Sequence, residues 1–395
     1  MPRFPMSRTC PFEPPEPYAR LREKAPMSPV MMPDGKRAWL VTSHAFARTL
    51  LLDERSSSNR LNPGFPELVP GLHTLAKQTT GFMSWMDGAE HSGHRRRLTG
   101  EFTLRRVREL RPRLQQITDD AVTAMLELGP PADLVQAVSY PVPSLVVCEL
   151  LGIPYEDRAF FQGQAHTMAD RRSDGAQRIG ALGQLRKFLD ALVTKRENAP
   201  EDDLISRMIQ RYRDADEYDH DQMTGLAMQL LVAGHESTAN MISLGVVALL
   251  RHPEQLAQFR SDPSLARTTV EELLRFFSIS DPVTSRVATA DISIGEYTIR
   301  EGEGMVIPNA AANWDPGVFA APEELNINRD ARRHFAFGYG AHQCLGQHLG
   351  RLELDIAYTT LFSRVPTIRL AVPFEELPFK SDAMLYGINE VPITW

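Results

Sequence analysis

The chain has 395 residues, of which 43% are hydrophobic, 24% are charged and 8% are aromatic. This ordinary composition excludes collagen-like, disordered and coiled-coil proteins, and a net charge of −7 argues against a nucleic-acid-binding protein, whose surface is usually basic. The three cysteines, Cys10, Cys148 and Cys344, are too few for a disulfide framework and indicate a reducing compartment.

The sequence predicts neither a targeting segment nor a membrane span. The N-terminal residues MPRFPMSRTCPF lack the apolar run of a signal peptide. The most apolar long stretch, 222–250, is interrupted by Gly234, His235, Glu236 and Asn240, so a buried helix is expected there. We therefore expect a cytoplasmic protein with no membrane association.

In chain order, the first expected elements are short. Nine of the 29 prolines precede residue 34, which favours an extended start. A helix (17–24), a strand (38–42) and a second helix (44–52) are expected next. Residues 56–86 show little periodicity and predict a long surface loop, a kind of segment that is usually functional or disordered.

Helical spacing dominates from 88 to 277, where proline and glycine separate the segments. The helices expected there are 88–108, 113–128, 133–151, 155–170, 176–196, 202–212, 219–250, 253–260 and 266–277. Strand-like runs follow at 283–287, 291–299 and 304–308, then an irregular stretch (312–336), a helix (344–363) and a tail of strands and turns. No repeat or linker divides the chain, so we expect one mainly α domain, 1–395, with small β-sheets.

Residues 337–346, FGYGAHQCLG, place one cysteine after a glycine-rich turn and at the start of a helix. A Cys344 thiolate there would face unpaired backbone N–H groups and the positive helix end, which both favour an anion. Gly340 would allow the turn, Gly346 would let a flat ligand approach the helix, and Phe337 could shield the sulfur.

The residues of this segment also allow other interpretations. Lone cysteines are often simply buried small hydrophobic residues. The spacing Gly338-x-Gly340 lacks the third glycine of a dinucleotide fingerprint. A zinc site from His342, Cys344 and His348 would lack a fourth ligand at the usual spacing.

The pattern F-G-x-G-x-H-x-C-x-G resembles the haem-ligand loop of the cytochrome P450 family. The resemblance implies that Cys344 is the axial thiolate of a heme b (iron protoporphyrin IX) cofactor. It also implies the mainly α cytochrome P450 fold, with the haem between the long helix 219–250 and the helix that starts at Cys344.

A second polar segment, AGHEST at 233–238, lies within the predicted long helix. It fails the zinc-protease signature H-E-x-x-H, because residue 239 is alanine. Gly234 costs about 1 kcal/mol in a helix interior, so it calls for a reason, such as close approach of a cofactor or a local bulge. The alternative is a structural polar cluster bonded to backbone carbonyls.

The same segment is similar to the family's oxygen-activation motif A-G-x-(Asp/Glu)-Thr. Glu236 then matches the acid and Ser237 the alcohol, with Thr238 as a second candidate for the alcohol. An acid followed by hydroxyls is what a proton relay requires. Serine in place of threonine keeps the hydroxyl but loses the methyl group that restricts χ1.

Further residues match family positions. Glu272 and Arg275 resemble the structural E-x-x-R pair, with Arg329 as its expected partner. The cofactor-binding cations implied by the resemblance, which would bind the haem carboxylates, are His91, Arg95, Arg286 and His342. The substrate contacts implied by the resemblance are Leu230, Ala233, Pro282, Val283 and Leu385.

The stretch 95–113 carries eight arginines against Glu101 and Glu109. An acidic electron-transfer partner could dock there by charge complementarity, although solvated charges on exposed helices are equally common. Cys10 and Cys148 alone cannot hold an iron–sulfur cluster, which generally needs four thiolates. Electrons are therefore expected from a separate ferredoxin and ferredoxin reductase.

The resemblance extends over nearly the whole chain to soluble actinobacterial members of the family. It implies a monooxygenase that inserts one oxygen atom of O2 into a lipophilic polyketide or macrolide, terpenoid or xenobiotic. One alternative keeps the haem but joins aromatic rings or uses peroxide. A more remote one is a non-catalytic haem- or zinc-binding module.

Overall fold

The computed structural model describes residues 1–68, 71–77, 79–169, 173–381 and 383–395. Its contacts divide the chain into two units that each combine separate segments. The first unit comprises Met1–Arg95, Leu274–Leu325 and Ala331–Cys344, and the second comprises Arg96–Leu273, Asn326–Asp330 and Leu345–Trp395. Two helices continue from one unit into the other, α4 (Gly88–Thr99) and α13 (Ala266–Phe277).

The first unit is built on a five-stranded sheet in the order β1-β2-β8-β5-β3, with only β2 and β8 parallel. Its strands are β1 (Met27–Met31), β2 (Arg37–Val41), β3 (Ser56–Ser57), β5 (Ser285–Ala288) and β8 (Gly304–Val306). A hairpin of β6 (Ile292–Ile294) and β7 (Tyr297–Ile299) adds to the unit. The helices are α1 (Pro17–Lys24), α2 (His44–Leu52), α3 (Leu72–Lys77) and α14 (Asn309–Asn313).

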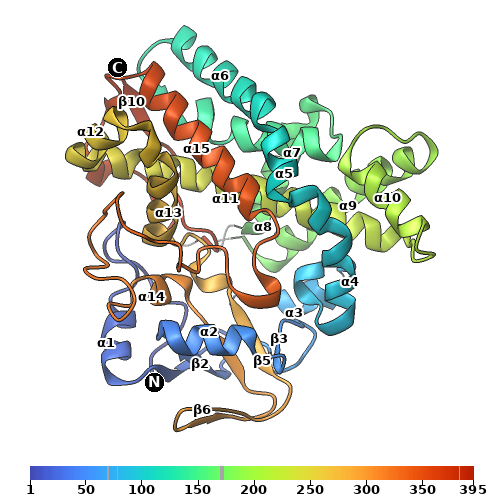
Figure 1. Cartoon of the computed structure of the whole chain (residues 1–395). Helices are drawn as coiled ribbons and strands as arrows, with labels where there is room; N and C mark the ends of the chain where they lie inside the picture. The colour runs from blue at the N-terminus through green and yellow to red at the C-terminus, as the bar shows by residue number, and fades with distance from the viewer. Residues whose placement is uncertain (69–70, 78, 170–172, 382) are drawn as a thin grey trace. The chain divides into compact units, whose positions relative to one another are not determined.

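Helix α2 lies beside this sheet (Figure 1). Ala47, Leu50 and Leu51 on α2 join buried strand residues such as Val41 and Met305 in one hydrophobic core. Burial of such side chains contributes about 1.5–3 kcal/mol each. The Leu51 end of α2 borders the loop that leads to Cys344, so the core fixes that loop.

The second unit is helical and centres on α11 (His220–Arg251), which contacts α7 (Pro141–Leu151), α9 (Gly175–Asn198) and α15 (Gln347–Arg364). Figure 1 shows α15 beside α6 (Arg111–Leu128). The other helices are α5 (Leu104–Glu109), α8 (Arg158–Ala169), α10 (Leu204–Arg213) and α12 (Pro253–Ser261). A small sheet joins β4 (Ala132–Asp133), β10 (Pro392–Thr394) and β9 (Arg369–Leu370).

Helix α11 begins where the Asp219 side chain accepts a hydrogen bond from the Gln222 backbone N–H at 2.7 Å. It runs without the bulge considered for Gly234. A Cβ on Gly234 would lie 2.6 Å from Val147 Cγ2 on α7, so packing between these helices already requires glycine. No helix of the described residues is long and apolar enough to cross a membrane.

Several expected elements are confirmed, and others were wrong in bounds or type. The helix 266–277 matches α13, and 219–250 matches α11 within one residue. The expected helix 88–108 is broken, because α4 ends at Thr99 and the Thr103 hydroxyl caps α5. The expected strand 291–299 is a hairpin, since Gly295 turns the chain with φ +59°.

Other differences come from short elements. The expected loop 56–86 contains β3 and α3. Residues 69, 70 and 78 of this loop lie outside the described residues. Residue 170 of the expected helix 155–170 also lies outside them. Strand β1 and helix α14 were not predicted. The expected helix 133–151 starts late, because β4 and a π-helical turn (Val135–Ser139) precede α7.

Candidate functional site

The cysteine loop has the backbone that its glycines predict. Gly338 and Gly340 have φ values of +68° and +74°, and a Cβ on Gly340 would lie 2.3 Å from the Leu51 carbonyl oxygen. The Cys344 N–H donates to the Phe337 carbonyl at 2.8 Å. Cys344 is exposed, and the helix expected to start at this residue begins three residues later, because Gly346 is the N-cap of α15. The loop therefore presents an accessible sulfur beside a helix start.

Gly346 has a different role from Gly340. It occupies the N-cap position of α15 with an ordinary φ of −80°, and a Cβ there would meet no atom within 4 Å. The strain argument therefore applies to Gly340, while Gly346 leaves open space at the helix start.

Arg95 on α4 is a charge partner for the Cys344 sulfur. Burial lowers the pKa of Arg95, and attraction to a Cys344 thiolate opposes that shift. A neighbouring cation stabilises a thiolate over a thiol. Sequence reasoning placed Arg95 among carboxylate-binding residues, and the structure also brings its charge near the sulfur.

His91 and His342 stack with ring centroids 4.1 Å apart. His342 Nε2 lies 3.7 Å from Asp87 Oδ1, which also accepts the Ser58 N–H at 2.8 Å. Burial raises the pKa of Asp87, but the nearby His342 ring and the hydrogen bonds from Ser57 and Ser58 bring it down to about 2. Burial, followed by repulsion from His342, lowers the pKa of His91 to about 4. His342 thus faces the Asp87 carboxylate, and His91 is held against His342 by ring stacking.

Arg286 and Arg60 of the first unit are drawn out of water without an ion pair among the described residues. Arg286 is 8% exposed and donates to the Ser285 carbonyl at 2.8 Å. The Arg60 guanidinium lies 4.9 Å from the Trp85 ring centroid and 5.7 Å from that of Phe65. Burial lowers the pKa of both arginines to about 10, and for Arg60 the charge of Arg286 adds to this effect. The Asp87 carboxylate partly offsets this effect at Arg286, and a bound anion would further balance the two desolvated like charges.

A hollow of about 190 Å³ gives both guanidinium groups space for such an anion. It is lined by Ser58, Arg60, Ser285, Arg286 and His342 among others. The hydroxyl oxygens of Ser58 and Ser285 are buried and have no hydrogen-bond partner among the described residues. The hollow therefore combines positive charge with unused donors, as a carboxylate site requires. Arg60 was missed by sequence reasoning, because it lies in an aperiodic segment and only folding brings it beside Arg286.

The three polar residues 236–238 of α11 each bond to a different partner. Glu236 accepts from the Lys380 ammonium at 3.2 Å, and both side chains are buried. The Ser237 hydroxyl donates to the Ala233 carbonyl at 2.8 Å. This is the kind of bond expected if the segment is a structural polar cluster bonded to backbone carbonyls. Thr238 is hydrogen-bonded to Glu353. Lys380 and Glu353 were not identified from the sequence.

Glu353 on α15 is 2% exposed, and its Oε2 has no partner among the described residues. Burial raises its pKa from an ordinary 4.5 to about 8, against a smaller effect of the Thr238 hydrogen bond. The folded protein thus keeps a proton that the unfolded chain releases between pH 4.5 and 8.

The Glu353→Gln variant is expected to gain stability over wild type as the pH rises. Because the folded state binds more protons in this window, Glu353 lowers the free energy of unfolding with increasing pH, by at most about 1.4 kcal/mol per pH unit. Glutamine cannot ionise, so the variant does not show this decrease in the free energy of unfolding. Thermal unfolding at pH 5 and pH 8 measures it, with exposed Glu390→Gln as control. An equal difference between variant and wild type at both pH values would contradict the raised pKa.

The expected substrate-contact residues lie in both units. On α11, Leu230 is partly exposed and Ala233 is exposed. Pro282 and Val283 form a 3₁₀ turn (Asp281–Val283), and Val283 lines the 190 Å³ hollow. Leu385 is partly buried in the C-terminal segment. Their contact with a substrate stays a prediction.

The E-x-x-R residues are structural. Arg275 is fully buried and donates to the carbonyls of Asn313 at 3.1 Å and Pro322 at 2.9 Å. Glu272 accepts from Arg329 Nε at 3.1 Å, which confirms the expected partner. Within the described residues, no three His, Cys, Asp or Glu side chains form a metal site, so the His342–Cys344–His348 zinc alternative gains no support.

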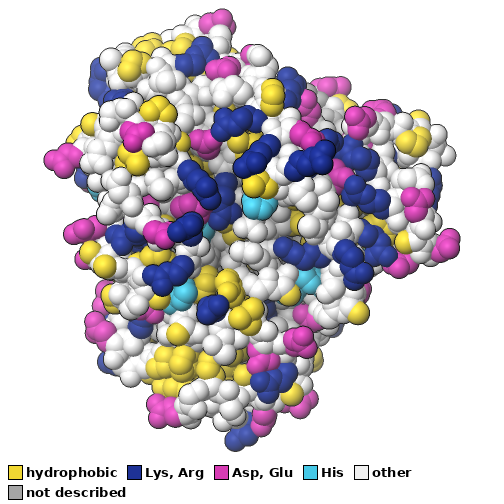
Figure 2. Space-filling model, in the orientation of Figure 1, with side chains coloured by type: hydrophobic (Ala, Val, Ile, Leu, Met, Phe, Trp, Pro, Cys, Tyr) yellow, Lys and Arg dark blue, Asp and Glu magenta, His cyan; other side chains and the backbone are white. Residues whose placement is uncertain are grey.

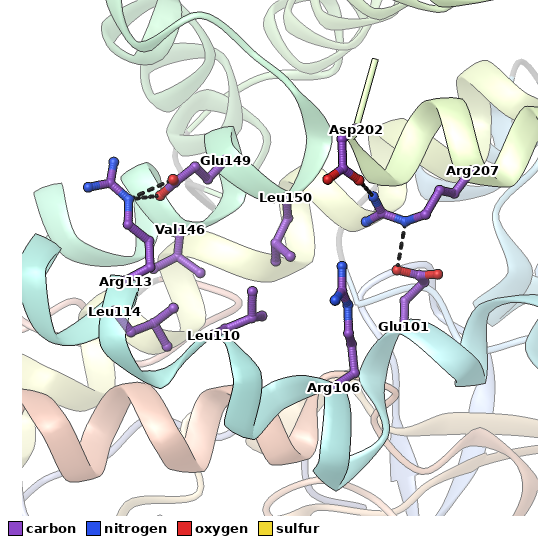
Figure 3. A pocket seen from close by; sticks show the side chains of 10 residues that line it. All are labelled: Glu101, Arg106, Leu110, Arg113, Leu114, Val146, Glu149, Leu150, Asp202 and Arg207. Atoms are coloured by element: carbon purple, nitrogen blue, oxygen red, sulfur yellow. Dashed lines mark hydrogen bonds and ion pairs between the residues drawn. The ribbon is translucent and has the colours of Figure 1, made fainter. Parts of the chain in front are cut away.

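Much of the basic stretch is neutralised by acids of the same protein. Figure 2 shows Lys and Arg side chains gathered over α5. A hollow of about 210 Å³ beside α5 has ion pairs at both ends, Arg113 with Glu149 and Arg207 with Asp202 and Glu101 (Figure 3). In the second unit, the exposed Arg96 and Arg108 are the arginines of this stretch that lack an acidic partner among the described residues.

Comparison with known proteins shows which family and which solved structures this chain resembles. The family model for cytochrome P450 matches residues 27–365. Pentalenic acid synthase of Streptomyces avermitilis is 46% identical over 393 residues, which cover 99% of this chain and 97% of that protein. The crystal structure of cytochrome P450 MoxA from Nonomuraea recticatena has a TM-score of 0.93 at 50% identity, over 100% of this chain and 98% of the other.

A third similar protein has been solved with a bound molecule. The mycinamicin VIII C21 methyl hydroxylase of Micromonospora griseorubida, solved bound to mycinamicin VIII, has a TM-score of 0.93 at 38% identity and full coverage of both chains.

Proposed function

The chain belongs to the cytochrome P450 family and is a monooxygenase, and we propose that it inserts one atom of O2 into a lipophilic secondary metabolite or xenobiotic with electrons from ferredoxin. The observation that carries this proposal is the cysteine loop. It combines an accessible Cys344, the left-handed Gly338 and Gly340, and the nearby positive charge of Arg95.

The residues of the first unit fit a haem. Cys344 would supply the thiolate ligand of the iron. The carboxylates of heme b would meet Arg286, Arg60 and His342 in the 190 Å³ hollow, whose positive charge and unused hydroxyls call for an anion. When bound, the haem supplies O2 activation and oxygen transfer to carbon.

The Arg286→Met variant is expected to lose haem faster than wild type, by about tenfold to a hundredfold. A hydrogen bond to a charged group contributes about 1.5–3 kcal/mol, and each 1.4 kcal/mol changes an equilibrium about tenfold. Transfer of haem to excess apomyoglobin measures the rate. The control is Arg300→Met, an exposed arginine that pairs with Asp291 at 2.6 Å. Wild-type haem loss in both Arg286→Met and Arg60→Met would contradict a carboxylate site here.

The chain's own residues would manage protons and electrons. Glu236, with Ser237 or Thr238, would pass protons along α11. Cys10 and Cys148, the other two cysteines, are too few to hold an iron–sulfur cluster, which supports a separate ferredoxin as the proposed electron donor. An acidic ferredoxin would find unpaired positive charge at Arg96 and Arg108.

The substrate class rests on apolar residues and on the relatives. The expected contact residues are all apolar, as in sites that bind lipophilic ligands: Leu230, Ala233, Pro282, Val283 and Leu385. Relatives at 46% and 38% identity are named pentalenic acid synthase and mycinamicin VIII C21 methyl hydroxylase. A terpenoid or macrolide is therefore the proposed class for this chain.

Turnover of a terpenoid and macrolide panel under ¹⁸O2, with ferredoxin, its reductase and NADPH, tests the proposal. A product that carries one ¹⁸O atom is the expected result. A ring-coupled product without label would support the alternative reaction instead. Binding only of small charged metabolites would contradict the proposed substrate class.

A further inference from the structure

A buried lysine outside the catalytic motif is fully engaged by neighbours of the second unit. The Lys380 side chain is 4% exposed. Its Nζ donates to the Tyr140 hydroxyl at 2.8 Å, Asn240 Oδ1 at 3.0 Å and Glu236 Oε1 at 3.2 Å. An ammonium group has three N–H donors, so each one has an acceptor. The site is therefore built around a charged lysine.

Local backbone structure brings this lysine to α11. Phe379 and Ile388 form an isolated β-bridge, and the Lys380 N–H donates to the Gly387 carbonyl at 2.8 Å. A Cβ on Gly387 would lie 2.2 Å from Asn240 Oδ1. Glycine at 387 thus lets the segment approach α11 closely enough for Lys380 to reach Glu236.

The electrostatics make Lys380 the counter-charge of Glu236. A buried carboxylate without a partner is costly, and removal of one member of a buried pair leaves that cost uncompensated. His235, the neighbour on α11, does not replace the lysine, because burial lowers its pKa and favours the neutral ring. Tyr140 is half-buried, and burial raises its pKa, so its hydroxyl carries a proton in the resting state.

We infer that Lys380 is a positioning residue for Glu236 and that Tyr140, Lys380 and Glu236 form the route by which protons are resupplied. This inference rests on the proposed function. In the resting pair the proton lies on the Lys380 ammonium. Its transfer to Glu236 neutralises both groups, and Glu236 carries it onward. The amine then takes a proton from the Tyr140 hydroxyl, which regains one from water, so each cycle moves one solvent proton inward.

NADPH-dependent O2 consumption with excess ferredoxin and reductase, measured in H2O and D2O, tests this route without a known substrate. Lys380→Met is expected to lower the rate about tenfold or more and to increase the solvent isotope effect. Lys380→Arg, which keeps the charge and donors, should restore most of the rate. Tyr140→Phe should lower the rate at least about threefold without a change of charge, and it serves if Lys380→Met folds poorly.

A double-mutant cycle separates positioning from structural support. If Lys380 acts through Glu236, Lys380→Met should change the rate of the Glu236→Gln variant by less than about threefold. An equal factor in both backgrounds, or a wild-type rate and isotope effect in Lys380→Met, would overturn the inference. Each variant must keep the reduced carbon monoxide band. A wild-type enzyme without that band would overturn the proposed function itself.

Discussion

Replacement of Cys344 by alanine is expected to abolish oxygen insertion and the thiolate spectrum of the protein. Alanine removes the only sulfur of the glycine-rich loop, and no other described residue of that loop supplies a thiolate. A thiolate ligand donates electron density that favours cleavage of the O–O bond. Haem held by Arg286, Arg60 and His342 alone would lack this effect. Product formation and the spectrum of the reduced, carbon monoxide-treated protein measure both losses.

Cys10→Ala is the matched control, because it also removes one cysteine from the first unit. It should keep the wild-type spectrum and turnover. A Cys344→Ala protein that still shows the thiolate band would mean that another residue ligates the iron.

Glu236→Gln is expected to lower turnover by about a hundredfold while it leaves haem binding intact. A positioned acid or base contributes about 10²–10⁴-fold to a reaction that transfers protons in its transition state. Glutamine keeps the shape of the side chain and can still contact Lys380, but it cannot carry a proton. NADPH-dependent O2 consumption and product formation measure the effect.

The control for this variant is Glu376→Gln, an exposed residue of the second unit. It should behave as wild type. Wild-type turnover in Glu236→Gln would remove the relay from the account and would favour a structural polar cluster on α11.

Sequence alone predicted local backbone features of the candidate site, which depend on residues close together in the chain. The cysteine loop is a ten-residue pattern whose glycines impose left-handed backbone, and Gly338 and Gly340 have the corresponding φ values. Helix α11 was predictable because a long apolar stretch keeps helical periodicity. Arg329 was found because its family position was known.

Residues that depend on distant contacts were not predictable in this way. Arg60 and Lys380 carry no periodic signal, and each acquires its role only when folding places it beside Arg286 or Glu236. The sequence marks Gly234 as unusual in a helix, but glycine is required there because Val147 of another helix packs against it. The 3₁₀ turn at Gly100–Phe102 with the Thr103 cap, and the hairpin turn at Gly295, show that local turn and cap residues outweigh periodicity at boundaries.

The most direct test of the central claim is the absorption spectrum of the purified wild-type protein, reduced with dithionite under carbon monoxide. A Soret band at the red-shifted position from which the family takes its name is predicted, because Cys344 would ligate the iron as a thiolate. A band at the position of histidine-ligated or thiol-ligated haem, or a protein that binds no haem, would contradict the assignment of Cys344 as the thiolate ligand.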